Sequence, residues 1–309
     1  MPPFSQDSPT TGQTGETEIL RLIQERLGGA SPPAPEGIGD DCATWNPPTD
    51  ETTLLTADPV IFGQHFDASH APDLVGAKLL KRNLSDIAAM GGRPGPALLA
   101  LAMGPDLHLE WLAEFIGGLA AACTTYDVPL AGGDISSAAP GIFIATLTQT
   151  GLARRPITRQ GAMPGSPILV TGTLGASLTG KHLHFKPRLA EGQWLQNQEP
   201  VLSMTDISDG LAKDLPSLLP EGTQAHIDLA DLPVDPAADT VQQALCDGED
   251  YELLFTLKPN ADLRKWPFDT PLQQIGTVRK GEPGGIIINK ATGVPVETEN
   301  GYEHFTTAY

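Results

Sequence analysis

Acidic residues recur in this sequence where a predicted strand ends or where an apolar run meets glycine. Five such junctions share a carboxylate beside a small or turn-forming residue: Gly37–Asp41, Thr56–Asp58, Gly132–Asp134, Asp206–Gly210 and Gly248–Glu252. Carboxylates at the ends of elements face clefts, where glycine lets a ligand approach the backbone. Mg²⁺ prefers these oxygen ligands and shares them with substrate phosphates. Each junction alone is typical of turn and helix-cap chemistry, but the five together favour a multi-metal site that handles phosphate.

Asp86 is a separate candidate because it lies inside a predicted helix, beside the apolar residues Leu84 and Ile87. A carboxylate in that position either lies on the exposed face or turns inward to a cation, because a buried unpaired charge is too costly. The helical pattern alone favours exposure, which is the more common outcome.

Three further motifs resemble known sites but lack a required part. The segment Gly175–His182 nearly matches a P-loop, but His182 stands where that motif needs a hydroxyl for Mg²⁺. His182 and His184 have no acid or cysteine beside them in the sequence, which favours the surface over a zinc site. Ser85 and Ser208 each precede an aspartate but lack the GxSxG turn, so a hydrolase triad is unsupported.

Helical and extended segments alternate along the chain and must position these residues. Apolar spacing predicts helices at 16–29, 72–92, 108–127 and 211–219. Strands are predicted at 52–58, 96–104, 128–134, 141–153, 167–172, 225–229, 251–257, 274–278 and 285–289. This alternation predicts an α/β fold with mixed α+β sheets in two domains.

The predicted domain boundaries follow changes in composition. Residues 1–15 are polar and turn-rich, which predicts a disordered tail. The first domain then covers residues 16–150. A segment rich in proline and arginine follows it, and the second domain covers residues 151–309.

Composition excludes several classes of function. The 309 residues include 38 Asp and Glu against 19 Lys and Arg, a formal net charge of −19, which repels nucleic-acid phosphates. No apolar run approaches the roughly 18–20 residues that span a bilayer. Three scattered cysteines are typical of reduced thiols rather than a disulfide framework, so we expect a cytoplasmic protein.

Taken in order, the motifs resemble the thiamine-monophosphate kinase family of the aminoimidazole ribonucleotide synthetase superfamily. The resemblance covers nearly the whole chain after residue 16. Its main blocks are GIGDDCA (37–43), TADPVIFGQHF (56–66), NLSDIAAMGGRP (83–94), GGD (132–134), TRQGAMPG (158–165), VTGTLG (170–175), TDISDGLAKDL (205–215), GEDYELLF (248–255) and GYEHF (301–305). Their shared order and spacing are more specific than any single block.

The resemblance implies a two-domain homodimer that transfers the γ-phosphoryl group of ATP directly to thiamine monophosphate, with several Mg²⁺ ions. It implies metal ligands at Asp41, Thr56, Asp58, Asp86, Asp134, Asp206 and Asp209. It implies ATP contacts at Gly133, Asp134, Arg159 and Ser208, and substrate contacts at His65, Glu249 and Tyr302. No separate catalytic residue is expected, because the acceptor phosphate is already anionic and metal ions offset the repulsion between the two polyanions.

Three departures from the family pattern bear on this prediction. Ala57 replaces a second hydroxyl, Ile135 follows the GGD block, and Ser166 follows the TRQGAMPG block. They leave open an altered substrate preference or weakened activity. The alternatives are another ATP-dependent enzyme of the superfamily, or a paralogue that binds nucleotide without catalysis. The GEDYELLF and GYEHF blocks favour the kinase.

Overall fold

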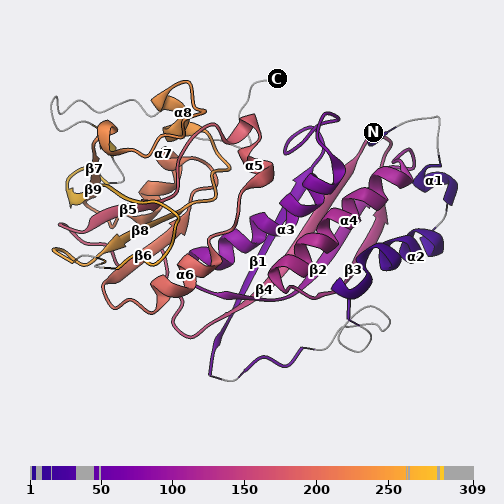
Figure 1. Cartoon of the computed structure of the whole chain (residues 1–309), viewed down its shortest axis with the longest axis horizontal. Coiled ribbons are helices and arrows are strands. Elements are labelled where there is room, and N and C mark those ends of the chain that lie inside the picture. The colour runs from indigo at the N-terminus through magenta and orange to yellow at the C-terminus, as the bar shows by residue number, and fades with distance from the viewer. Residues whose placement is uncertain are drawn as a thin grey trace. The chain divides into compact units, whose positions relative to one another are not determined.

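The computed structural model describes residues 2–4, 9–14, 16–32, 45–48, 50–261, 263, 265–283 and 286–288. The chain forms two compact units, one made of residues 1–87 and 93–154 and the other of residues 88–92 and 155–309 (Figure 1). The first unit ends after Arg154, close to the domain boundary that the sequence predicts at residue 150.

The first unit is built on a four-stranded sheet in the order β1-β4-β2-β3. Its strands are β1 (Thr52–Ile61), β2 (Arg93–Met103), β3 (Leu130–Ser137) and β4 (Phe143–Ala153). Strands β1 and β2 run antiparallel to β4, and β3 runs parallel to β2. Side chains alternate between the two faces, so β2 buries Leu99 and Leu101 and exposes Leu98. All four strands agree with the sequence prediction.

Two long helices, α3 (Pro72–Ala89) and α4 (Leu109–Tyr126), cover one face of this sheet (Figure 1). A third helix, α2 (Glu16–Leu27), continues into a 3₁₀ turn at Gly28–Ala30 and packs against α4. Trp111 of α4 packs edge-on against Phe143 of β4, with 4.9 Å between ring centroids. The three helices occupy segments in which the sequence predicts helices.

The described part of the N-terminal segment packs against the start of α4. Residues Thr11–Thr14 form a short helix, α1. The backbone N–H of His108 donates to the carbonyl oxygen of Pro3 at 2.7 Å. The sequence predicts disorder over 1–15, and its polar composition does not reveal these backbone hydrogen bonds to a distant segment.

The second unit is built on a six-stranded sheet in the order β10-β7-β9-β5-β8-β6. Its strands are β5 (Pro167–Thr171), β6 (Val201–Asp206), β7 (Thr223–Ile227), β8 (Leu253–Leu257), β9 (Leu272–Lys280) and β10 (Ile286–Ile288). Strand β10 is parallel to β7, and the other neighbours are antiparallel. Two mixed sheets with helices confirm the predicted two-domain α/β class.

The helices of the second unit are short. They are α5 (Lys181–His184), α6 (Leu189–Gln196), α7 (Leu211–Asp214) and α8 (Val241–Cys246), with 3₁₀ turns at Ser177–Thr179, Leu215–Leu218 and Leu229–Asp231. The helix predicted over 211–219 ends early because Pro216 lacks the N–H that would continue the hydrogen-bond ladder. Four of these elements are absent from the sequence prediction: the helices α5, α6 and α8 and the strand β6.

Apolar residues pack on both faces of the second sheet. On β5, Ile168 belongs to the same core cluster as Leu211 of α7, whereas Leu169 packs with Leu195 of α6. The sheet is therefore buried on two sides, and its functional residues must lie at strand ends and in loops. No described helix has the length and apolar character needed to cross a membrane.

Candidate active site

The first acidic cluster lies where the edge strand β1 faces α3. Thr56 Oγ1 donates to Asp86 Oδ2, and Asn83 Oδ1 accepts from the backbone N–H of Asp58 at 3.0 Å. Arg82 Nη2 lies 3.6 Å from Asp58 Oδ1. Asp86 therefore points toward β1, which is the less common of the two outcomes that its helical position allows.

Asp134 lies at the opposite edge of the same sheet. Backbone pairing places Asp58 in one row with Leu147, Leu99 and Gly133. Asp134 follows Gly133 and faces the other side of the sheet. Three strand spacings of roughly 4.8 Å separate β1 from β3 by about 14 Å. Because Mg²⁺ binds oxygen at about 2.1 Å, Asp58 and Asp134 of one chain cannot share an ion.

Gly133 allows β3 to approach β2 closely. A β-carbon at this position would lie 1.7 Å from the carbonyl oxygen of Leu99, so any other residue would displace the strand. Asp134 is exposed, and Ser136 Oγ donates to its Oδ2 at 2.8 Å. The predicted ATP contacts Gly133 and Asp134 thus lie on an accessible strand edge.

His65 lies in the turn that follows β1. Its Nδ1 accepts from the backbone N–H of Ile61 at 3.0 Å, so in the neutral ring the proton is on Nε2. Lys78 Nζ donates to the backbone carbonyl of His65 at 3.0 Å. The buried ring is therefore held in one orientation and, when neutral, in one tautomer.

In the second unit, the loop after β6 and the loop before β8 are joined by backbone hydrogen bonds. The N–H of Glu249 donates to the carbonyl of Ser208 at 2.7 Å, and the N–H of Tyr251 donates to that of Ile207 at 2.8 Å. The predicted ATP contact Ser208 and the predicted substrate contact Glu249 are therefore neighbours.

Asp214 closes the loop that carries Ser208 and Asp209. Its Oδ2 accepts from the backbone N–H groups of both residues at 2.9 Å. Burial raises the pKa of Asp214 to about 6; negative Asp209 adds to the rise and positive Arg159 opposes it. Arg159 therefore acts electrostatically on this loop. The sequence analysis does not single out Asp214, although it lies in the same DISDGLAKD segment.

Two predicted metal ligands lie at this loop, Asp206 just before it and Asp209 within it. Asp206 is buried at the end of β6, and Asp209 Oδ2 lies 3.0 Å from Lys213 Nζ. Within the described ranges, no three His, Cys, Asp or Glu side chains gather as a ready metal site. Carboxylate oxygens such as these are ligands that Mg²⁺ prefers, with water and substrate phosphates completing its coordination.

Glu249 has a backbone conformation that few non-glycine residues adopt. Its φ is +65°, and that of Tyr251 is +53°, a left-handed geometry that costs roughly 1–2 kcal/mol per residue. His182 Nδ1 lies 3.2 Å from Glu249 Oε2, and the Tyr251 hydroxyl donates to Oε1 at 3.1 Å. His182 is only 5% exposed, so the prediction of a surface histidine is wrong there, whereas His184 is exposed as predicted.

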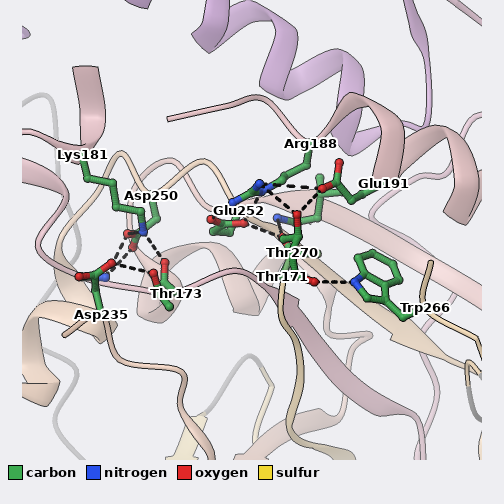
Figure 2. A network of polar contacts seen from close by, with 12 residues as sticks. Thr171, Thr173, Lys181, Arg188, Glu191, Asp235, Asp250, Glu252, Trp266 and Thr270 are labelled. Atoms are coloured by element: carbon green, nitrogen blue, oxygen red, sulfur yellow. Dashed lines mark hydrogen bonds and ion pairs between the residues drawn. The ribbon is translucent and has the colours of Figure 1, made fainter. Parts of the chain in front are cut away.

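Figure 2 shows how the residues that follow Glu249 are anchored. Asp250 is fully buried and accepts from Lys181 Nζ and from the backbone N–H of Gly175, both at 3.0 Å. Glu252 accepts from Arg188 Nε at 2.7 Å and Nη2 at 2.6 Å. Lys181 thus binds a buried carboxylate, which agrees with the prediction that the near P-loop is not a phosphate cradle.

Two sets of residues from the sequence analysis remain: predicted site residues that are not described by the structure, and departures from the family pattern. Asp41 and Tyr302 lie outside the described residues, as do the blocks at 37–43 and 301–305. Of the departures from the family pattern, Ser166 is fully buried and its Oγ accepts from the N–H of Met163 at 3.2 Å, which gives it a structural role in a turn. Ala57 is exposed on the sheet face opposite the helices.

Comparisons with known proteins agree with this fold. The N-terminal domain of AIR synthase related protein matches residues 39–153, and its C-terminal domain matches residues 163–289. These two domains define the class of protein to which the chain belongs, the AIR synthase related proteins.

Full-length relatives identify the family within that class. The thiamine-monophosphate kinase of Escherichia coli is 33% identical, over 95% of this chain and 99% of that one. The crystal structure of the Stenotrophomonas maltophilia thiamine-monophosphate kinase is 28% identical with a TM-score of 0.73, over 88% of this chain and 95% of that one. AaThiL complexed with AMPPCP and TMP is 29% identical with a TM-score of 0.72, over 97% and 100%. The chain belongs to the thiamine-monophosphate kinase family.

Proposed function

We propose that the chain is a magnesium-dependent kinase that transfers the γ-phosphoryl group of ATP to the phosphate of thiamine monophosphate, giving thiamine diphosphate and ADP. One observation carries the proposal: the loop with Ser208 and the loop with Glu249 are hydrogen-bonded to each other. Residues matched to the nucleotide and to the acceptor are therefore adjacent. The family relatives support the same reaction, and AaThiL forms a complex with an ATP analogue and TMP.

The acidic residues are assigned to Mg²⁺. In the first unit the assigned ligands are Thr56, Asp58, Asp86 and, at the other sheet edge, Asp134; in the second they are Asp206 and Asp209; Asp41 completes the set. Bound Mg²⁺ neutralises phosphate charge during an in-line transfer. The distance between the two edges of the first sheet assigns Asp58 and Asp134 of one chain to different ions.

The nucleotide is assigned to Gly133, Asp134, Arg159 and Ser208. Arg159 contributes a permanent positive charge, which suits phosphate oxygens. This charge acts to lower the pKa of Asp214, which accepts from the backbone N–H groups of Ser208 and Asp209. Because the acceptor phosphate is anionic, the residues need only orient the two substrates, and no general base is assigned.

The acceptor is assigned to His65, Glu249 and Tyr302. The His65 ring, held by the hydrogen bond from the N–H of Ile61 to its Nδ1, is assigned to the phosphate of the acceptor. Thiamine carries a cationic thiazolium ring and an amino group, and the carboxylate of Glu249 complements both. The ring of Tyr302 is assigned to pack on the thiamine heterocycle.

The proposal includes a homodimer. Among the described residues of the first unit, helices cover one face of the sheet. Its other face, here called the open sheet face, carries Leu55 and Leu98, which are 73% and 47% exposed, with the small exposed residues Ala57 and Ala100. An exposed apolar surface of this kind favours an interface, and a second copy offers the same surface.

The proposal also places the protein in the cytoplasm. Among the described residues, neither Cys123 nor Cys246 forms a disulfide, and reduced cysteines suit a reducing compartment where ATP is available.

A direct assay tests the reaction. Incubation with ATP, Mg²⁺ and thiamine monophosphate should yield equal amounts of thiamine diphosphate and ADP, measured by chromatography. Unphosphorylated thiamine is the matched control and should yield no product. ADP formation with formylglycinamidine ribonucleotide instead would favour another enzyme of the superfamily. Nucleotide binding without turnover would favour a non-catalytic paralogue.

A further inference from the structure

The segment Lys181–Phe185 contacts the loop that carries Glu249 at three points. Lys181 Nζ lies 3.0 Å from Asp250 Oδ1, and His182 Nδ1 lies 3.2 Å from Glu249 Oε2. The Phe185 ring stacks on the Tyr251 ring, with centroids 4.1 Å apart and an angle of 21° between their planes. Each of three consecutive loop residues therefore has its own partner in this segment.

The contacts alternate along the loop. Asp250 forms an ion pair with Lys181, and Glu252 forms one with Arg188 (Figure 2). These two ion pairs anchor the loop to the segment that contains Lys181 and Arg188. Glu249 precedes the first of these two residues, and Tyr251 lies between them. Both have the costly left-handed backbone conformation. Strained residues persist only where their surroundings fix them, and they cluster at functional sites. The anchors therefore determine where Glu249 stands.

The carboxylate of Glu249 is held at both oxygens. His182 Nδ1 contacts Oε2, and the Tyr251 hydroxyl donates to Oε1. Two contacts on different oxygens restrict rotation about the last bond of the side chain. A group oriented before binding loses less conformational entropy when the ligand arrives.

We propose that His182 is a positioning residue of the kinase reaction, which orients the Glu249 carboxylate toward the thiamine part of the acceptor. This inference rests on the proposed function, which assigns Glu249 to the acceptor. The contact through which it acts is the 3.2 Å approach of His182 Nδ1 to Oε2 of Glu249. The histidine acts through Glu249 rather than on a substrate directly.

Substitutions that mimic one ring nitrogen test this role. His182→Asn keeps a donor near the Nδ1 position, His182→Gln moves it to the Nε2 position, and His182→Leu removes it. His182→Leu and His182→Gln should raise KM for thiamine monophosphate about tenfold, with kcat and KM for ATP within threefold of wild type. His182→Asn should restore KM to within threefold. His184→Asn, on the exposed side of the same segment, is the matched control and should leave all constants unchanged.

A double-mutant cycle separates positioning from general support of the fold. In a Glu249→Ala background, His182→Leu should change KM for thiamine monophosphate less than twofold, because the residue through which it acts is gone. A further tenfold rise there would overturn the proposal, as would an unchanged KM in His182→Leu alone. Thermal unfolding of each variant reports the fold separately. A wild-type enzyme that makes no thiamine diphosphate would overturn the proposed function and this inference with it.

Discussion

The backbone N–H of Glu249 donates to the carbonyl oxygen of Ser208 at 2.7 Å. With the bond from Tyr251 to Ile207, it extends the antiparallel pairing of β6 and β8 beyond the pair Asp206–Leu253. The register of one strand pair therefore sets the relation between the loop assigned to ATP and the loop assigned to the acceptor.

Asp58→Asn and Asp86→Asn should each lower kcat by about a hundredfold or more, because a neutral amide binds Mg²⁺ much more weakly than a carboxylate. Both side chains are half-buried, so the fold of each variant should persist, with a Tm near that of wild type. Steady-state kinetics over a range of Mg²⁺ concentrations measure the effect. Asp73→Asn, exposed in the first turn of α3, is the control. Full activity in either variant would contradict the metal assignment.

Gly133→Ala should destabilise the first unit by about 2–3 kcal/mol, since the added β-carbon would overlap the carbonyl of Leu99. Gly132→Ala is a matched control on the same strand, because its β-carbon would meet only Leu98 Cδ2 at an ordinary 3.5 Å. Urea unfolding of the two variants measures the difference. Equal stability of the two would show that β3 can shift to admit a side chain.

The contribution of Asp250 to the free energy of unfolding should fall as pH rises from about 4 to 7. Burial raises the pKa of Asp250 to about 7, although Lys181 and the N–H of Gly175 offset part of the rise and Glu252 adds to it. The folded state therefore holds this proton more tightly than the unfolded chain, whose carboxyl titrates near 3.8. The stabilisation is fully present below about pH 4 and is lost as pH rises through about 7.

Asp250→Asn tests this linkage, because the amide keeps an acceptor for Gly175 and cannot ionise. The variant should lose up to about 4 kcal/mol of the pH dependence, at about 1.4 kcal/mol per pKa unit. Denaturant unfolding at pH 4, 5, 6 and 7 measures it. Glu221→Gln, at an exposed position, is the control. Its free energy of unfolding should depend on pH as in the wild type. An unchanged slope in Asp250→Asn would mean that its carboxyl remains ionised throughout this range.

Substitution of Leu55 and Leu98 by lysine should convert the proposed dimer into monomers. Both side chains are exposed in the single chain, so the variant should fold, and each leucine buried between copies contributes about 1.5–3 kcal/mol. Analytical ultracentrifugation measures the oligomeric state. Leu178→Lys, at a position 63% exposed in the second unit, is the control. A wild-type monomer, or a double variant that stays dimeric, would contradict the assignment of the open sheet face.

Local sequence patterns determined most of the secondary structure. The alternating residues of β2 and the apolar spacing of α4 report which side of each element is buried, and this information is contained in a short segment. The motif blocks likewise identified Asp58, Asp86 and Glu249 as functional candidates. The segment from 177 to 206 was predicted poorly, since its helices and strand β6 are short and its prolines and glycines interrupt any periodic pattern.

Tertiary structure alone decided which candidates meet. Strand order places Asp58 and Asp134 on opposite edges of one sheet, and nothing in either segment encodes the order of the strands between them. The sequence shows no acid beside His182, yet the folded chain brings Glu249 within 3.2 Å of its ring. The spacing of apolar residues shows which side of a segment is buried and which side faces water. Contacts between distant segments depend instead on strand register and on packing across the core, which only the complete fold defines.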